Sequence, residues 1–371
     1  MTTSLADVTA VLEELYPSAW AEPWDAVGLV CGDPAAPVDR VLFAVDPVAA
    51  VVEEALAGGF DLLVTHHPLW LRGTTTVAAD TAKGRVAHRL VTGGCALFVA
   101  HTNADVADPG VSDALAAAVG LHDTSPLQPQ PAAPLDKLVV FVPLGQEAAL
   151  LDALAEAGAG ALGAYERCAW TTSGTGTFRP GPGANPSVGA VGAVTELDEA
   201  RLEMVLPRHR RAAVLRALAQ AHPYEEPAFD LLELAAVPGR RGMGRIGELA
   251  PVTVAELMAR VAGALPGTSW GVRASGDPHR VVRSLAVCGG AGDGLLREAA
   301  AADAYLTADL RHHPASEAPE GLALLDAAHW ATEWPWLADA ARQLAAATSV
   351  GTAVSTICTD PWTTSARSLQ A

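Results

Sequence analysis

Positive charge is scarce in this chain of 371 residues, in which 24 Lys and Arg stand against 42 Asp and Glu and the formal net charge is −18. A field of that sign repels phosphate backbones and anionic lipid surfaces, which argues against nucleic acid or a membrane as a partner. Long apolar runs are lacking too, because no stretch reaches the ~18 uninterrupted residues that cross a bilayer. The opening residues 1–7 also lack the basic and apolar regions of an export signal.

Cysteine is equally sparse, with five scattered residues and no CxxC pair. This usage predicts reduced, mostly structural thiols and a cytoplasmic protein. Apolar residues, in contrast, are abundant: 50% of the chain is hydrophobic and only 18% is charged, which excludes a largely disordered protein. The length is typical of about two domains.

Short apolar runs bounded by Gly and Pro alternate with Ala- and Leu-rich stretches at helical spacing in the first third of the chain. The strands predicted there are 40–45, 61–64 and 96–100, and the predicted helices are 6–16, 49–57, 82–92 and 111–119. This βαβα order predicts an α/β fold with a buried sheet.

A segment with a different order of elements interrupts this alternation. Residues 136–236 predict the order β-α-β-β-α-β, which is the ferredoxin-like pattern, between a Pro-rich connector at 125–134 and a Gly-rich linker at 238–247. The α/β alternation then resumes, with predicted strands at 281–287, 304–306 and 321–325 and helices at 254–264, 295–302 and 334–345. We therefore expect a discontinuous α/β core, made of residues 1–131 and 240–371, with an inserted α+β domain.

Imidazole and carboxylate side chains gather just past three of the predicted core strands. The three groups are His66 with His67, His101 with Asp105, and His329 with Glu333. Open α/β sheets place ligand sites at the carboxyl ends of their strands, so we expect the three groups to converge. In the second and third groups a spacing of four residues would aim both side chains the same way from one turn of helix.

These six side chains form a mixed nitrogen and oxygen donor set without a thiolate. Such a set suits Zn²⁺, Mn²⁺, Fe²⁺, Co²⁺ or Ni²⁺ better than Mg²⁺ or Ca²⁺. Six donors exceed one tetrahedral site and fit two ions ~3.5–4 Å apart, which would lower the pKa of a bound water towards ~7. The alternative is that each histidine is an ordinary hydrogen-bonded residue, although burying several such groups without partners is costly.

A glycine-rich loop, Gly289–Gly294, follows the predicted strand 281–287. Its backbone N–H groups, those of Gly290 and Gly292 among them, could hold a substrate anion at the start of the next helix. The alternative is a close strand-to-helix turn. A second pattern, GxGxxG at 242–247, has no strand directly before it and is interpreted as a turn rather than a dinucleotide site.

The same motifs resemble the signatures of the NIF-three-like family, whose members often carry the label GTP cyclohydrolase 1 type 2 homolog. The three metal motifs are Thr65–Pro68, His101–Asp105 and Asp326–Glu333, and the further matches are Trp24–Val30, Cys288–Gly292 and Thr307–Asp309 followed by His313. The inserted segment is similar to that of the longer members, which has a fold like CutA and the PII signalling proteins. It matches at Gly158–Tyr165, Gly174–Phe178 and His222–Pro227.

The resemblance implies a dinuclear divalent-metal centre. Its ligands would be His66, His67, Asp105, His329 and Glu333, with Glu333 as the bridge. His101 would occupy a close position as a base or an extra ligand. His313 would lie near the site, where it could contact a substrate.

The resemblance also implies an assembly and an activity. The assembly is a ring-like homohexamer built as a trimer of dimers, and the activity is metal-dependent hydrolysis of a small nucleotide-like substrate such as GTP. The alternative is a non-enzymatic metal-binding or regulatory protein that uses the insert to sense a ligand or partner.

Overall fold

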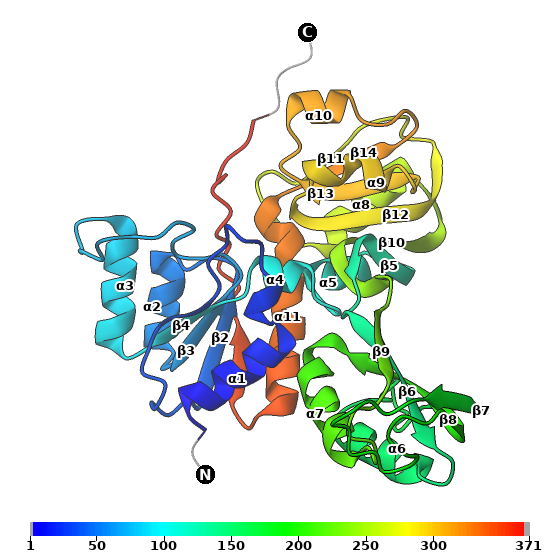
Figure 1. The fold of residues 1–371 in the computed structure, drawn as a ribbon. Coiled ribbons are helices and arrows are strands. Elements are labelled where there is room, and N and C mark those ends of the chain that lie inside the picture. The colour runs from blue at the N-terminus through cyan, green and yellow to red at the C-terminus, as the bar shows by residue number, and fades with distance from the viewer. Residues whose placement is uncertain (1–2, 367–371) are drawn as a thin grey trace. The chain divides into compact units, whose positions relative to one another are not determined.

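The strands expected near residues 40, 61 and 96 form the middle of a five-stranded sheet in the computed structural model, which describes residues 3–366 (Figure 1). The sheet order is β1-β4-β3-β2-β15, and all neighbours are parallel except β1, which pairs antiparallel with β4. Its strands are β1 (Gly28–Cys31), β2 (Arg40–Ala44), β3 (Leu62–Thr65), β4 (Ala96–Val99) and β15 (Gly351–Val354).

A second sheet has six strands in the order β11-β14-β13-β12-β10-β5. Its central strands β12, β13 and β14 are parallel, and β11 and β10 flank them in antiparallel pairing. The strands are β5 (His122–Pro131), β10 (Pro238–Thr253), β11 (Val272–Ala274), β12 (Val281–Ala291), β13 (Ala304–Ala308) and β14 (Ala323–Ala327).

Side-chain alternation explains why the parallel strands are apolar throughout. In β2, Val41 and Phe43 pack into the core shared by both sheets, whereas Leu42 and Ala44 pack under the helices of the opposite face. A sheet that is covered on both faces needs apolar residues at every position. The helices around the two sheets are α1 (Leu5–Leu15), α2 (Ala49–Ala57), α3 (Ala82–Gly93), α4 (Thr102–Asp105), α5 (Val111–Ala118), α8 (Val254–Ala264), α9 (Leu296–Ala299), α10 (His312–Ser316) and α11 (His329–Ala347).

Helix α11 contacts both sheets, through β2 and β15 of the first and through β12 and β13 of the second (Figure 1). Its Trp336 is fully buried and donates an indole hydrogen bond to the hydroxyl of Tyr16 at the end of α1 (3.1 Å). A buried indole needs such a partner for its N–H group. No helix among residues 3–366 has the length and apolar character to cross a bilayer.

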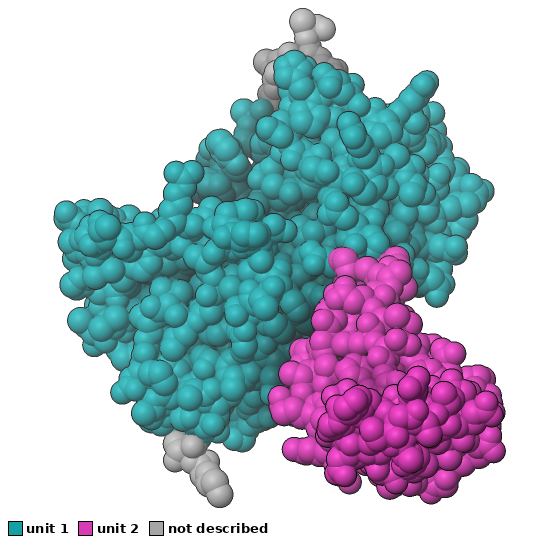
Figure 2. All heavy atoms as spheres, viewed as in Figure 1, with its two compact units in different colours: residues 1–130, 240–371 teal, residues 131–239 magenta. Residues whose placement is uncertain are grey.

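The chain divides into two units, which are coloured separately in Figure 2. Unit 1 combines residues 1–130 and 240–371 and contains both sheets described above; unit 2 is residues 131–239. The mixed α/β class predicted from the sequence is confirmed. The predicted connectors at 125–134 and 238–247 instead contribute to strands β5 and β10, because their backbones pair at the edge of the second sheet.

Unit 2 has its own four-stranded antiparallel sheet, in the order β7-β8-β6-β9. Its elements are β6 (Leu135–Pro143), α6 (Glu147–Glu156), β7 (Trp170–Phe178), β8 (Thr195–Pro207), α7 (Arg211–Ala221) and β9 (Phe229–Glu233). This element order is the ferredoxin-like one. Side chains such as Leu138, Leu154 and Leu218 form a core separate from that of unit 1.

A buried arginine joins the two sequence halves of unit 1. Arg245 on β10 is 2% exposed and makes a bidentate ion pair with Asp113 on α5 (2.7 Å to each oxygen). Its other N–H groups donate to the backbone carbonyls of Ala107, Gly242 and Gly244 at 2.6–2.8 Å. The guanidinium thus replaces water for all of these acceptors.

We predict that Arg245→Ala lowers the free energy of unfolding by about 3 kcal/mol, because it leaves a carboxylate and three carbonyls without their partner. The matched control is Arg240→Ala. Arg240 also pairs with an aspartate, Asp108, but its side chain is 90% exposed, so the loss should stay below ~1 kcal/mol. Urea unfolding followed by circular dichroism measures both, and equal losses would contradict the anchoring role.

Candidate metal centre

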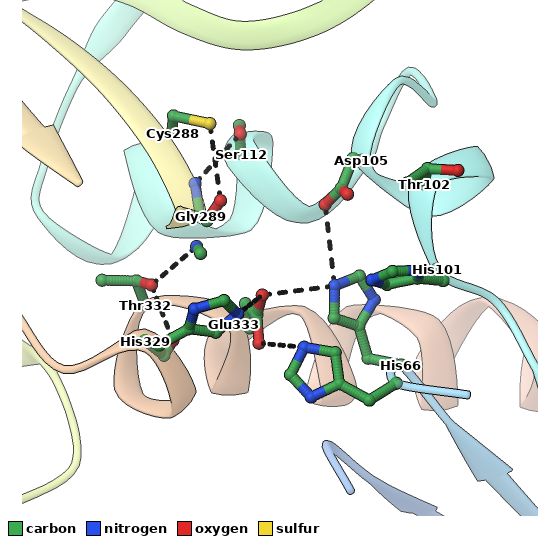
Figure 3. A network of polar contacts seen from close by, with 12 residues as sticks. His66, His101, Thr102, Asp105, Ser112, Cys288, Gly289, His329, Thr332 and Glu333 are labelled. Atoms are coloured by element: carbon green, nitrogen blue, oxygen red, sulfur yellow. Dashed lines mark hydrogen bonds and ion pairs between the residues drawn. The ribbon is translucent and has the colours of Figure 1, made fainter. Parts of the chain in front are cut away.

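The three groups predicted from the sequence converge in unit 1, at the carboxyl ends of strands from both sheets (Figure 3). His66 and His67 directly follow β3, and His101 lies between β4 and the single-turn helix α4. His329 and Glu333 occupy the first turns of α11, directly after β14 of the other sheet. The site therefore depends on parallel strands of both sheets ending at the same place.

Each of the four imidazoles is oriented by an acceptor at its Nδ1 atom. The acceptors are the carbonyl of Ala100 for His66 (2.9 Å), Asp46 for His67 (2.8 Å), Asp25 for His101 (2.8 Å) and Asp309 for His329 (2.7 Å). A ring that donates its Nδ1–H in this way has only Nε2 left for a second partner. Metal-binding histidines in proteins are held by outer acceptors of the same kind.

Glu333 lies at the centre of the cluster, between His66 and His329 (Figure 3). Its carboxylate Oε1 is 2.9 Å from Nε2 of His329 and 3.5 Å from Nε2 of His66, and its Oε2 is 3.1 Å from Nε2 of His67. Asp105 Oδ1 lies 3.7 Å from the same His66 Nε2 atom, on the side of α4. Glu333 and His66 are almost completely buried, at 3% and 1% exposure.

Burial and charge act in opposite directions on the imidazoles. Burial lowers the pKa of His67, but the charge of Glu333 and the hydrogen bond to Asp46 outweigh it and raise the pKa to about 10. For His329, the same balance, with Asp309 as the hydrogen-bond partner, raises the pKa to about 11.

The carboxylates respond in the complementary way. Burial raises the pKa of Glu333, but the charges of His67 and His329 overcome that effect and hold the pKa well below its usual range. At Asp105 burial dominates and the pKa is raised. The cluster therefore holds the ionised carboxylate of Glu333 away from water. Its negative charge is balanced only when neighbouring imidazoles are protonated or when they bind a metal cation.

The donor atoms fit a divalent cation. His66 Nε2 and Glu333 Oε2 are buried and have no hydrogen-bond partner within residues 3–366. His67 Nε2 and Glu333 Oε2 form an ion pair, but their geometry does not meet that of a hydrogen bond. In this cluster, two sets of three residues each offer ligand atoms that lie within 4.8 Å of one another: His66, His67 and His101 form one set, and His67, His329 and Glu333 form the other.

The backbone at Gly290 packs closely against one side of the cluster. Gly290 has φ +67°, and a Cβ atom there would lie 2.5 Å from Glu333 Oε1 and 3.1 Å from His329 Nε2. The position therefore accommodates only glycine. The backbone N–H of Gly290 donates a hydrogen bond to Thr332 Oγ1 (2.9 Å), so this N–H group is not available to bind a substrate anion.

The other predicted loop features differ from expectation. The helix predicted at 295–302 is a short 3₁₀ turn followed by the four-residue α9, because the chain turns back into β13 at Ala304. Gly292 is buried against Tyr305 and Thr307 rather than against the cluster. His313 is exposed on α10 beside His312, and within residues 3–366 its side chain makes no hydrogen bond or ion pair with the cluster.

Three aspartates that orient the imidazoles were not among the predicted site residues. Asp46 follows β2 and Asp309 follows β13, so both lie at the carboxyl end of a parallel strand, the same signal that identified the histidines. Asp25 is different, because it precedes β1 and reaches His101 only through the tertiary fold. Asp46 also accepts a hydrogen bond from Thr359, more than 300 positions away in the sequence.

Comparisons with known proteins give a consistent result. The family model described as Duf34/NIF3 (NGG1p interacting factor 3) matches residues 3–361. The chain is 52% identical over 375 residues to a GTP cyclohydrolase 1 type 2 homolog of Mycobacterium leprae, covering 99% of this chain and 97% of that protein. It is 42% identical over 369 residues to one from Streptomyces coelicolor, covering 97% and 93%.

Solved structures resemble the chain over the same length. A Bacillus cereus protein related to NIF3 has a TM-score of 0.78 and 33% identity, over 98% of this chain and 99% of that one. A Staphylococcus aureus protein has a TM-score of 0.83 and 28% identity, over 97% and 98%.

We predict that Gly290→Ala lowers the free energy of unfolding of the metal-free protein by ~1–3 kcal/mol, because the new methyl group displaces Glu333 and the backbone is strained. Gly294→Ala is the control, since a Cβ there meets nothing within 4 Å, and its effect should stay within ~0.5 kcal/mol. Thermal unfolding of both variants in a chelator measures the difference. A Gly290 variant as stable as the control would show that the backbone at Gly290 does not pack closely against Glu333.

Proposed function

The chain belongs to the Duf34/NIF3 family, and from this premise we propose that its histidine–carboxylate cluster is the two-metal centre of a hydrolase for small nucleotide-like substrates. One observation carries the proposal. Four imidazoles have their Nδ1 atoms engaged by protein acceptors, and the Nε2 atoms of three of them, His66, His67 and His329, lie around the ionised, buried carboxylate of Glu333. Such an arrangement costs stability unless a cation occupies it.

The proposed ligands are His66, His67, Asp105, His329 and Glu333. Glu333 suits a bridging role, because one of its oxygens faces His329 while the other faces His67. The mixed donor set favours Zn²⁺, Mn²⁺, Fe²⁺, Co²⁺ or Ni²⁺. When bound, two such ions would activate water for hydrolysis and stabilise negative charge on a substrate.

His101 is the proposed base. Its Nδ1–H is donated to Asp25, whose carboxylate also accepts from the backbone N–H of Thr102 (3.0 Å). Burial raises the pKa of Asp25, but the hydrogen bonds from His101 and Thr102 lower it by more, so the carboxylate remains ionised. An imidazole held in this way presents Nε2 as a proton acceptor, as in other aspartate–histidine pairs.

An exposed aromatic ring supports a substrate with a planar base. Trp24 is 56% exposed and lies edge-on to His101, with 6.1 Å between the ring centroids. Its free face can stack on a base next to the cluster, as aromatic side chains do with nucleotides. The names of the curated relatives point to GTP as a first substrate to test.

We predict that purified protein, dialysed against Zn²⁺ or Mn²⁺ and then against metal-free buffer, retains two ions per chain. The Glu333→Gln and His67→Ala variants should each lose at least one ion, because each substitution removes one of the proposed metal ligands. His88→Ala, which removes an exposed imidazole on α3, is the control and should keep both. Elemental analysis provides the measurement, and full metal retention in both site variants would refute the proposed ligand set.

We predict turnover by the metal-loaded protein within a panel of GTP, other nucleotides and simple phosphoesters. His101→Gln should keep its metal while its rate falls by ~10²–10⁴, the usual contribution of a general base. Asp105→Ala should lose both metal and rate. Chromatography of the reaction products detects turnover. Silence of the wild-type protein across the panel would favour the non-enzymatic alternative.

A further inference from the structure

Unit 2 contains a cavity of about 680 Å³ that the proposed hydrolase site does not use. It is bounded by the end of β7, by β8, by the Pro- and Gly-rich segment 179–188, and by residues 224–228. Its volume lies in the range typical of small-molecule sites. All of its lining residues belong to unit 2, so the cavity is independent of the metal centre.

The carboxylate of Glu199, on β8, lines this cavity. Glu199 Oε1 accepts a hydrogen bond from the hydroxyl of Tyr224 (2.8 Å), whereas Oε2 receives no hydrogen bond from any described residue. A Cβ atom at Gly176 would lie 1.9 Å from Glu199 Oε2, so the glycine on β7 makes room for this carboxylate. One oxygen is thus fixed by tyrosine, and the other remains available to a ligand.

Aromatic rings line the cavity next to this carboxylate. The rings of Phe178 and Tyr224 are 6.0 Å apart between centroids, and Phe141 contributes a third ring. Aromatic faces attract cations through their quadrupole, and a neighbouring carboxylate strengthens that preference.

The other charged residues that line the cavity favour a cation over an anion. Glu225 and Glu226 also line the cavity, against a single cation, Arg179. This excess of negative charge opposes phosphates and other anions. A bare metal ion is also poorly served, because the groups of three or more potential ligand atoms found within residues 3–366 all lie elsewhere.

The polar residues of the segment 222–227 hold the cavity in shape. His222 donates from Nε2 to the carbonyl of Phe141 (2.8 Å) and accepts at Nδ1 from the N–H group of Tyr224 (3.0 Å). Glu225 accepts from the backbone N–H of Asn185 and so ties the segment 179–188 to the cavity (3.0 Å). A site whose groups are fixed in advance loses less entropy when a ligand binds.

We propose that this cavity binds a small organic cation, an amine or guanidinium compound. Its N–H groups donate to Glu199, and its charge lies against the rings of Phe178 and Tyr224. The proposal does not depend on the metal centre or on hydrolysis. It gives the inserted unit a ligand chemistry of its own.

The test is isothermal titration calorimetry of the full-length protein with agmatine, which carries both a guanidinium and an ammonium group. The uncharged comparison is N,N′-diacetylputrescine, and the anionic comparison is GTP. Glu199→Gln removes the charge while keeping an acceptor for Tyr224. Asp198→Asn makes the same chemical change at the next residue of β8, which is exposed and does not line this cavity.

We expect agmatine to saturate one site per chain with a Kd below ~1 mM, and to bind at least about tenfold more weakly to Glu199→Gln. Asp198→Asn should bind as the wild type does, and all variants should keep the same metal content. Phe178→Leu supplies a second variant, should Glu199→Gln fail to fold, and is expected to weaken binding severalfold. Absence of agmatine binding, equal binding of the uncharged compound, or wild-type affinity in Glu199→Gln would overturn the proposal.

Discussion

The structure of unit 1 depends on one buried charge, the carboxylate of Glu333. It lies among three imidazole Nε2 atoms at 2.9–3.5 Å, almost completely removed from water. A charge in that position is tolerated only with a compensating positive charge beside it. The neighbouring histidines supply it when protonated, and a divalent cation would supply it more strongly. Strands of both sheets end beside Glu333, and this arrangement brings the histidines and the carboxylate together.

The surroundings of the cluster restrict it to one arrangement. Acceptors on every Nδ1 atom fix the rings, and Gly290 allows the backbone to approach Glu333 where any side chain would collide. The acceptors lie in loops next to strands of both sheets, and Thr359 near the end of the described chain donates a hydrogen bond to Asp46 in turn. A change far from the cluster can therefore alter its geometry through this outer layer.

Much of this arrangement could be predicted from the sequence. The βαβ alternation predicted the α/β class, and the rule that ligand sites lie beyond strand ends brought His66, His101 and Glu333 together. Asp46 carried the same signal, but a single aspartate after a strand is too common to be singled out. Asp25 and Asp309 stood inside segments that resemble the family, Trp24–Val30 and Thr307–Asp309, but the sequence did not show that each orients an imidazole. Thr359 could not be found, because only the tertiary fold brings it near Asp46. The strands β5 and β10 were missed because Pro and Gly lower strand propensity. The proline-rich β5 is the edge strand of its sheet, where proline is tolerated, and the glycine-rich β10 lies next to it. The hexamer, the binding of two metal ions, their identity and the hydrolytic activity stay predictions.

The central claim is that Glu333 and its imidazole neighbours share a pair of cations. Anomalous diffraction from crystals grown with Zn²⁺ or Mn²⁺, recorded on both sides of the metal absorption edge, tests it directly. The account predicts two anomalous peaks per chain, both beside Glu333, one towards His66 and His67 and one towards His329. Crystals of metal-saturated protein with no peak beside Glu333, or with peaks only at surface residues, would contradict it.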